Sequence, residues 1–385
     1  MVYGPMKVII AQPYLNIKGG AERVVLEIAK HYDAKIYTLE YDKKNTFEGF
    51  SELDINIIGK DIPLSGMLPY KASQGLRFGY NFYNLELKED YDVINAHISP
   101  SEWIRHKNRG VLWYCHTPPR EVYDLYAERM KYRTYKEKFI YATMAKAYKM
   151  VSHKVVGKIE CIATNSETTK ERIARYFQRE ADVANPGIDY NAFETKAYEK
   201  FFFYPSRITP NKRQDYVINA FKKFVSKTGR KDYRLVLAGA LSKNPEHTAY
   251  LTKIKKLSNG LNVKIITNIS DKELKDLYSR AYAVLFAAIN EDYGYIPLEA
   301  MASRKPVISV NEGGPKETIL DGKTGFLVNS DKEMGDKMAM LVDHPSTAER
   351  MGKEGQKRVS LLYSWKAFFK KFDSLLEDTK KKSDL

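Results

Sequence analysis

Short apolar segments that favour β-strands alternate with helical patterns along this chain, and the alternation occurs twice. In the first half the strand-like segments are KVIIAQ, AKIYTLEY, INIIG, YDVINAH, VLWYCHT and CIATNS. In the second half they are FFFYPSRI, YRLVLAGA, VKIITNI, AVLFAAI and KPVISVN. Helical patterns such as AERVVLEIAKHY and QDYVINAFKKFVSKTG separate them. This alternation is typical of parallel βαβ units, so it predicts an α/β protein with doubly wound sheets.

The length of the chain, 385 residues, favours two domains over one, because single cores rarely grow beyond about 250–300 residues. Asn185, Pro186 and Gly187 interrupt both periodicities. We therefore expect a first domain at 1–184 and a second at 185–364. The remaining residues, 365–385, form a predicted last helix, and its aromatic face is expected to pack back toward the first domain.

Cysteine content and hydropathy restrict the cellular setting. Cys115 and Cys161 are the two cysteines, and their surroundings have neither disulfide-framework nor zinc-ligand spacing. The amino-terminal apolar run is too short for a signal peptide, and no span of about 20 apolar residues occurs. A cytoplasmic protein is expected, with peripheral binding to the inner face of the plasma membrane as a further possibility.

The net charge of +15 calls for an anionic partner. Basic residues are concentrated in the segment 129–158, where a helical projection places Tyr132, Tyr135, Phe139 and Met150 near one face. Such a helix could lie on an anionic membrane, or it could pack in the core with a solvated basic back, and the sequence leaves both open. No nucleic-acid-binding signature accompanies the charge, so nucleic acid is not an expected partner.

Two carboxylates eight residues apart are the first candidates for a functional site. Glu291 follows the strand AVLFAAIN, and Glu299 lies about one turn inside the helix that starts near Ile296. A strand end and a helix start can together hold hydroxyls and a phosphate. The spacing alone would also suit a solvated turn and an exposed helix face.

Further candidates follow other strands. Gly19 and Gly20 lie between the first strand and its helix, where the missing Cβ allows close approach of a phosphate or sugar. They do not form a GxGxxG fingerprint, so no dinucleotide cofactor is implied. Arg207 and Lys212 flank a turn after FFFYPSRI, and His116 ends the strand VLWYC. A tight turn, solvated surface charges and a structural histidine are the simpler readings.

Taken together, these segments resemble the retaining glycosyltransferases of family 4. The similar stretches are GGAERVV, TNSETTKERI, ANPGID, PSRITPNKR, EDYGYIPLEAMASRKPVIS and NEGGPKETILDGKTGFLV, in the order of the family. The resemblance implies the GT-B fold, in which two Rossmann-like domains face each other across a cleft. It also implies that the first domain forms the acceptor side and the second binds the nucleotide-sugar donor.

The resemblance assigns roles to the candidate residues. It implies that Arg207 and Lys212 bind the donor diphosphate, that Glu291 contacts the transferred sugar, and that Glu299 contacts the ribose. His116 would lie beside the donor sugar. The remaining donor-binding positions are backbone groups at Gly19, Gly20, Gly294, Tyr295 and Ile296. Asp292 stands where the family motif usually has Gly or Ser, and this difference leaves the details of sugar binding open.

The string YCHTPPR resembles enzymes that transfer mannose from GDP-mannose during polysaccharide and lipid-linked oligosaccharide assembly. We therefore expect mannosyl transfer to a glycan or lipid-linked acceptor. Another donor (UDP-glucose, UDP-galactose or UDP-N-acetylglucosamine), a nucleotide-sugar 2-epimerase, or a silent sugar-binding protein are the alternatives. The resemblance favours attack by the acceptor on the face that the diphosphate leaves over a covalent intermediate.

A metal or other cofactor is not expected, because Arg207, Lys212 and helix amino termini can neutralise the diphosphate. Asp90 and Asp92 have the DxD spacing of a metal signature from a different glycosyltransferase fold. Their position just before a strand favours a simple turn.

Overall fold

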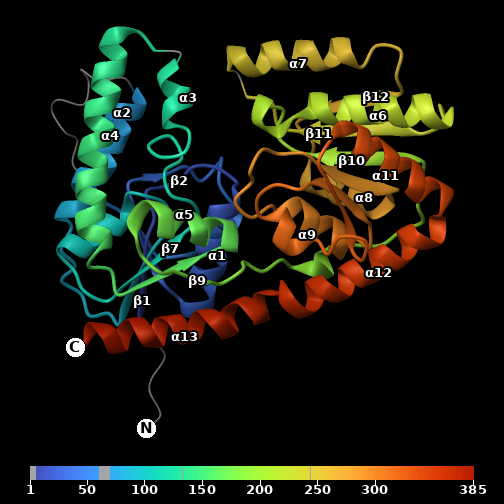
Figure 1. Cartoon of the computed structure of the whole chain (residues 1–385). Coiled ribbons are helices and arrows are strands. Elements are labelled where there is room, and N and C mark those ends of the chain that lie inside the picture. Colours follow the sequence, from blue (N-terminus) through green and yellow to red (C-terminus); the bar gives the residue numbers. More distant parts are fainter. Residues whose placement is uncertain (1–5, 60–69, 132, 243) are drawn as a thin grey trace. The chain divides into compact units, whose positions relative to one another are not determined.

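A computed structural model describes residues 6–59, 70–131, 133–242 and 244–385. The chain divides into two compact units. Unit 1 comprises residues 1–185 with 369–385, and unit 2 comprises 186–368. In each unit helices cover a parallel sheet (Figure 1). The predicted α/β architecture of two Rossmann-like domains is confirmed, and each unit is described below by itself.

The main sheet of unit 1 has seven strands in the order β5-β3-β1-β6-β7-β8-β9. All neighbouring strands are parallel. The strands are β1 (Val8–Ala11), β3 (Lys35–Thr38), β5 (Ile55–Ile57), β6 (Val93–Ala96), β7 (Val111–Cys115), β8 (Cys161–Thr164) and β9 (Asp182–Val183), and β2 (Tyr14–Leu15) pairs separately with β4 (Glu40–Tyr41). The helices are α1 (Gly20–Tyr32), α2 (Tyr70–Asn84), α3 (Tyr126–Lys131), α4 (Tyr135–Val156) and α5 (Glu167–Phe177), with short 3-10 turns η1 (Glu48–Glu52) and η3 (Ser101–His106).

The sheet of unit 2 has the order β12-β11-β10-β13-β14-β15 and is also parallel throughout. Its strands are β10 (Phe201–Pro205), β11 (Arg234–Gly239), β12 (Val263–Thr267), β13 (Ala283–Phe286), β14 (Val307–Val310) and β15 (Gly325–Val328). Its helices are α6 (Gln214–Thr228), α7 (Pro245–Leu257), α8 (Asp271–Arg280), α9 (Tyr295–Ala302), α10 (Pro315–Thr318), α11 (Asp331–Asp343) and α12 (Pro345–Leu362), with 3-10 turns η4 (Tyr190–Ala192) and η5 (Pro210–Lys212).

The central strands are apolar at nearly every position because helices cover both faces of each sheet. Every residue of β7 and β10 is buried, including Trp113 and the run Phe201, Phe202 and Phe203. In parallel sheets the carboxyl ends of the strands meet at one edge. Each sheet therefore brings its strand-to-helix loops together, and this edge carries the candidate residues.

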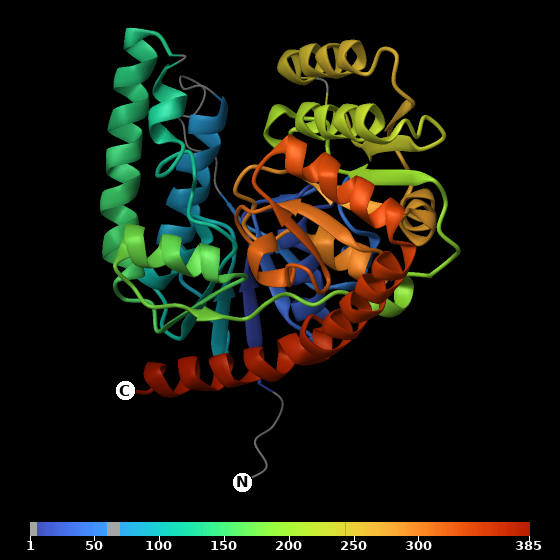
Figure 2. The same ribbon diagram turned by 45° about the vertical axis from the view of Figure 1, so that its right-hand side comes forward.

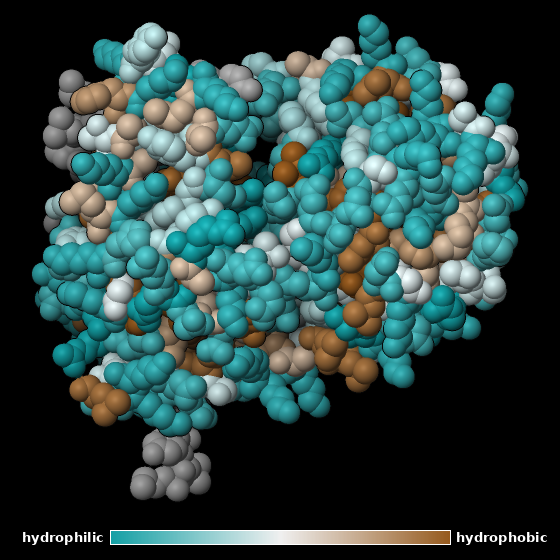
Figure 3. All heavy atoms as spheres, viewed as in Figure 1, coloured by the Kyte–Doolittle hydropathy of each residue, from teal (hydrophilic) through white to brown (hydrophobic). Residues whose placement is uncertain are grey.

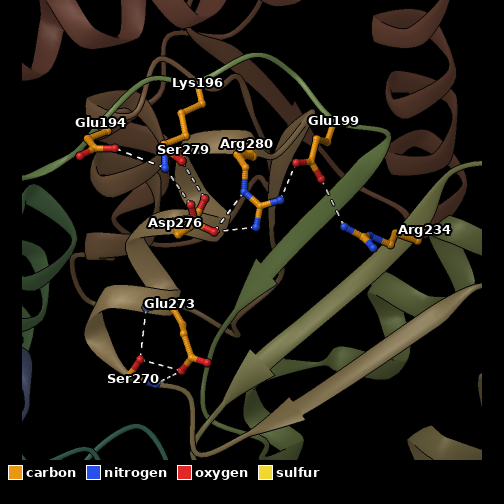
Figure 4. Close-up of polar contacts among 9 residues, drawn as sticks. All are labelled: Glu194, Lys196, Glu199, Arg234, Ser270, Glu273, Asp276, Ser279 and Arg280. Atoms are coloured by element: carbon orange, nitrogen blue, oxygen red, sulfur yellow. Dashed lines mark hydrogen bonds and ion pairs between the residues drawn. The ribbon is translucent and has the colours of Figure 1, made fainter.

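The opposite, amino edge of the unit 2 sheet is neutralised by its own ion pairs (Figure 4). Glu199 precedes β10 and binds Arg280 at 2.5 Å and Arg234 at 3.4 Å. Asp276 binds Arg280 at 2.6 Å and Lys196 at 2.9 Å. Charges at this edge thus satisfy one another without an external partner.

The structure of α4 argues against one of the two alternatives for the basic segment, namely that its aromatic face packs in the core. Tyr135, Phe139 and Met150 are 93%, 75% and 65% exposed, so these side chains do not pack in the core. Tyr132, assigned to the same face, lies outside the described residues. The buried face of α4 contacts η3 instead, where Trp103 Nε1 donates to Ser152 Oγ at 2.9 Å. No helix of the described residues is long and apolar enough to cross a membrane.

Helix α13 (Trp365–Ser383) starts in unit 2 and ends in unit 1. Within unit 1 the ring of Phe369 stacks on His31, with 3.7 Å between the ring centroids. Lys380 binds Asp92 at 2.6 Å. The aromatic face of this last helix therefore has a place to pack, against α1.

Candidate functional site

A short ion pair lies at the carboxyl edge of the unit 2 sheet. Lys212 Nζ is 2.5 Å from Glu291 Oε2. Lys212 comes from η5 after β10, and Glu291 comes from the loop after the neighbouring strand β13. The lysine is 8% exposed, so its charge is largely removed from solvent and neutralised by a single carboxylate. The structure thus brings together two predicted site residues that are 79 positions apart.

Both residues of this pair adjoin a backbone in the left-handed region. Arg213 has φ of 50°, and Asn290 has φ of 42°. Glu312 holds both of them, because its Oε1 lies 2.7 Å from Arg213 Nη1 and its Oε2 accepts from the Asn290 N–H at 3.3 Å. Strained backbone that neighbouring groups hold in place is a common feature of binding sites. Sequence reasoning did not assign a role to Glu312.

Arg207 lies in the loop after β10. Its side chain is exposed and makes no hydrogen bond or ion pair within the described part of the chain. Its backbone is fixed, since Gln214 Nε2 donates to the Arg207 carbonyl at 2.8 Å. Gly239 allows the close approach of this loop, because a Cβ at that position would lie 1.9 Å from the Ser206 carbonyl oxygen. A cation is thus presented on a rigid loop without an anion of its own.

Glu299 lies on α9 and is nearly buried. Its Oε2 accepts a hydrogen bond from the Tyr278 hydroxyl at 2.8 Å. The helix starts at Tyr295 after Gly294, whose φ is 85° and which supplies no side-chain cap. The first N–H groups of α9, including those of Tyr295 and Ile296, are therefore not capped by a side chain of the preceding residue.

Two glycines that the sequence reasoning quoted without a role support the Glu291 loop. A Cβ at Gly313 would lie 2.2 Å from the Glu291 carbonyl oxygen, and a Cβ at Gly314 would lie 2.5 Å from that of Tyr293. The Gly314 N–H also donates to the Glu291 carbonyl at 2.8 Å. The double glycine of NEGGPKE thus lets a second loop lie against the one that carries Glu291.

In unit 1 the start of α1 already holds a carboxylate. Gly19 precedes the helix, Gly20 is its first residue, and Glu22 lies in its first turn. A Cβ at Gly19 would come within 2.3 Å of Glu22 Oε2, so the acidic side chain folds over that glycine. This helix start therefore suits a sugar hydroxyl better than a phosphate, because its positive end faces a carboxylate of its own.

His116 lies at the carboxyl end of β7 and meets a second histidine. His116 Nε2 is 3.0 Å from Nδ1 of His97, which follows the adjacent strand β6. Burial lowers the pKa of His116 to about 3 and that of His97 well below its ordinary value. Both imidazoles are neutral at physiological pH. The sequence reasoning missed His97, although YDVINAH and VLWYCHT both end near a histidine.

The two aspartates of the DxD-like sequence, Asp90 and Asp92, make structural contacts with Lys7. Asp90 binds Lys7 at 2.7 Å, and Asp92 accepts from the Lys7 backbone N–H at 2.7 Å. Cys115 and Cys161 are free and buried. Among the described residues, no cluster of three or more His, Cys, Asp or Glu side chains is arranged to hold a metal ion.

Comparison with known proteins identifies two matching family models. The model for glycosyl transferases group 1 matches residues 190–358, and that for glycosyltransferase family 4 matches residues 18–192. The chain is 28% identical to alpha-1,3/1,6-mannosyltransferase ALG2 of Homo sapiens, over 94% of this chain and 93% of that protein. It is 29% identical to the Mus musculus protein of the same name, over 95% and 94%.

Solved structures show the same fold. Sucrose-phosphate synthase from Thermosynechococcus elongatus superposes with a TM-score of 0.74 at 18% identity, covering 97% of this chain and 98% of that one. Anabaena HepE, in complex with UDP-glucose, gives a TM-score of 0.72 at 16% identity, covering 97% and 99%.

Proposed function

The chain belongs to the retaining glycosyltransferases of family 4, and we propose that it transfers mannose from GDP-mannose to a glycan or lipid-linked saccharide. A nucleotide-sugar donor and a glycan acceptor follow from the family. The choice of mannose is supported by the similarity to mannosyltransferases over nearly the whole chain.

The ion pair between Lys212 and Glu291 is the observation that carries the proposal. A nearby anion stabilises the charge of a buried lysine, and in this structure Glu291 supplies one. A donor diphosphate can compete with Glu291 for Lys212, because its two phosphates together carry more negative charge than one carboxylate. Glu291 is then released to accept hydrogen bonds from hydroxyls of the sugar. Donor binding would thus place Lys212 on the diphosphate and Glu291 on the sugar in a single step.

Arg207 supplies the second positive charge on the diphosphate. Negative charge grows on the leaving diphosphate as the bond to the sugar carbon breaks, so cations stabilise the transition state more than the ground state. The acceptor hydroxyl oxygen bonds to that carbon on the same face, and its proton passes to the departing phosphate oxygen. Lys212 and Arg207 thus act as catalytic residues, and no protein nucleophile is needed.

Other groups position the donor. The N–H groups of Gly294, Tyr295 and Ile296 at the start of α9 bind phosphate or sugar oxygens, and Glu299 binds the ribose hydroxyls. His116 and the backbone of Gly19 and Gly20 in unit 1 contribute to sugar binding. The family resemblance and the positions of these residues at strand ends and helix starts support these assignments.

The reaction is proposed to need no divalent metal, because Arg207 and Lys212 neutralise the leaving group. Turnover measured after dialysis against EDTA should equal that of the untreated enzyme. A loss of activity that Mg²⁺ or Mn²⁺ restores would contradict this part of the proposal.

A donor screen tests the function directly. The purified chain is incubated with GDP-mannose, UDP-glucose, UDP-galactose or UDP-N-acetylglucosamine, and binding and hydrolysis are measured with and without a mannose-terminated acceptor. We expect GDP-mannose to be used and an α-linked product by NMR. Preference for a UDP-sugar would overturn the mannose assignment, and epimerised donor formed without acceptor would identify a 2-epimerase.

Substitution of the central carboxylate tests the site. Glu291→Gln keeps the shape but loses the charge that Lys212 and the sugar require, so kcat should fall at least a hundredfold while the fold is retained. Asp331→Asn is the matched control, because Asp331 forms a comparable pair with Lys223 at 2.6 Å. Normal turnover by Glu291→Gln would exclude the proposed site.

The exposed face of α4 is proposed to bind an anionic membrane surface. It carries the large side chains of Tyr135, Phe139 and Met150. The buried residues of α4 are smaller: Ala145, Ser152, Val155 and Val156. Five lysines and one glutamate lie on the helix, and that glutamate, Glu137, caps its amino end. Figures 1 and 2 both show α3 beside the amino-terminal part of α4, and in Figure 3 tan and pale residues interrupt the hydrophilic surface there.

Both contributions to such binding have the right sign. Apolar side chains gain about 25 cal/mol per Å² when they leave water, and each lysine near an anionic surface adds about 1 kcal/mol. Sedimentation with phosphatidylserine-containing vesicles should recover the protein, and neutral phosphatidylcholine vesicles should not. Replacing Tyr135, Phe139 and Met150 by Ser should lower partitioning at least tenfold. Leu361→Ser with Leu362→Ser, on exposed positions of α12, is the control.

A further inference from the structure

We infer that His97 is a positioning residue that fixes His116 in one tautomer, with its proton on Nδ1, so that His116 presents a hydrogen-bond donor to the sugar. This inference rests on the proposed role of His116 in donor binding. It assigns to that histidine a chemical function, namely donation to an oxygen, and to His97 the task of enforcing it.

The pair is closed to other partners on the His97 side. His97 is 0% exposed. Its Nδ1 faces His116 Nε2 at 3.0 Å, and its Nε2 is buried with no hydrogen-bond partner in the described part of the chain. The backbone of His97 is fixed as well, because its N–H donates to Ala11 O and Ser101 Oγ, and its carbonyl accepts from Trp113 Nε1.

These contacts decide which nitrogen carries the shared proton. Two neutral imidazoles share one proton between His97 Nδ1 and His116 Nε2. If His116 donated it, His97 would carry its own proton on the partnerless Nε2, and a buried N–H without an acceptor is rare in proteins. If His97 donates, only a lone pair remains unpaired. The second arrangement is favoured, and it leaves the His116 proton on Nδ1.

The rest of the His116 side chain is free to meet a ligand. Its Nδ1 has no recorded partner among the described residues, and the side chain is partly exposed. Asn165 Nδ2 donates to the His116 carbonyl at 2.9 Å, and Tyr114 packs against the ring with 5.0 Å between centroids. The ring is therefore held in place and offers a single donor. A sugar hydroxyl oxygen is a suitable acceptor, because a neutral N–H discriminates by geometry without attracting any passing anion.

The tautomer can be observed directly. The chain has seven histidines, so two-bond ¹H–¹⁵N correlation spectra of histidine-labelled full-length protein are tractable, and His116→Ala identifies the resonance. We expect protonated Nδ1 and unprotonated Nε2 for His116. In His97→Asp the carboxylate can only accept a hydrogen bond, so the His116 proton should move to Nε2. In His97→Asn the side-chain Nδ2–H can donate in place of the Nδ1–H of His97, so the native pattern should be retained.

Steady-state kinetics separate the two levels of the inference. His97→Asp should lower kcat about tenfold, the value of one hydrogen bond in the transition state, and His97→Asn should keep most of the native kcat. A native His116 protonated on Nε2, or an unchanged tautomer in His97→Asp, overturns the inference about His97. If the tautomer changes as expected while His97→Asp and His116→Ala turn over normally, the proposed role of His116 in donor binding fails instead.

Discussion

The carboxyl edges of the two sheets handle ionisable side chains in different ways. In unit 2 the edge is charged, with Lys212 paired to Glu291 and Arg213 paired to Glu312. In unit 1 the edge carries His97 and His116, which burial keeps neutral. One topology thus supports two electrostatic designs. A charged edge suits a diphosphate, and a neutral edge suits hydroxyl groups, because uncharged donors do not compete for the phosphates.

Within unit 2 the two edges also differ. At the amino edge Glu199, Asp276 and Arg280 satisfy one another in a closed network (Figure 4). At the carboxyl edge Arg207 has no recorded partner in the described residues. A closed network leaves no charge for a ligand, whereas the exposed guanidinium of Arg207 can still bind an anion. Lys305 precedes β14, at the amino edge, and it is fully buried. Burial lowers its pKa to about 8.

The largest expected effect comes from removing the buried cation of the charged edge. Lys212→Ala should lower kcat by about 10²–10³-fold, because the leaving diphosphate loses a preorganised charge. Lys223→Ala removes the cation of an exposed ion pair of similar length, 2.6 Å, and should leave kcat unchanged. Single-turnover rates with saturating donor measure both. If Lys212→Ala stayed within threefold of the native enzyme, the charged edge would have no catalytic meaning.

Unit 1 also contains a buried carboxyl group, that of Glu102, which lies against α4 through Tyr148. Burial raises the pKa of Glu102 from 4.5 to about 7, so this group, like the two histidines, favours its neutral form. The folded state holds this proton more tightly than the unfolded state. The contribution to stability is therefore fully present below about pH 4.5 and declines by roughly 3 kcal/mol as the pH rises to about 7.

Glu102→Gln should remove this dependence, so the variant should gain stability relative to the native protein between pH 5 and 7. Urea unfolding followed by tryptophan fluorescence measures it, since Trp103 and Trp113 both lie in unit 1. A pH-independent difference between the two proteins would show that Glu102 is charged in the folded state, and it would break the comparison between the units.

Sequence patterns were sufficient for the architecture, because strands buried on both faces produce apolar runs that differ clearly from amphipathic helices. Elements with weaker patterns were not predicted. Helix α7 (PEHTAYLTKIKKL) buries only Tyr250 and Ile254, and β15 (GFLV) is a short strand at the edge of its sheet. The helices α11 and α12 were not predicted either.

The candidate residues could be placed at strand ends from the sequence, but their partners could not. Spacing says nothing about a contact between Lys212 and Glu291 across adjacent strands. His97 could have been found, because neighbouring parallel strands that end in histidines bring them to one edge. Gly239 offered no such signal, since only the tertiary approach of Ser206 distinguishes it from other glycines.

Gly239→Ala tests whether the rigid presentation of Arg207 matters. The added Cβ would meet backbone at 1.9 Å, so the loop must move. We expect a loss of about 2 kcal/mol in stability and a higher KM for the donor. Gly75→Ala, where an added Cβ meets nothing within 4 Å, should not destabilise the protein. An unchanged KM in Gly239→Ala would mean that the position of this loop is not important for the donor.

The smallest expected effect concerns the hold on Glu299. Tyr278→Phe removes the hydroxyl that donates to Glu299 at 2.8 Å, and Tyr282→Phe removes one that donates to the Leu341 carbonyl at the same distance. Each should cost about 1 kcal/mol of stability. Only Tyr278→Phe should also raise the KM for the donor, by a few fold at unchanged kcat, because Glu299 would be less precisely placed for the ribose. Equal KM values in the two variants would leave Glu299 with a structural role and restrict the donor-binding side chains of unit 2 to Lys212, Glu291 and Arg207.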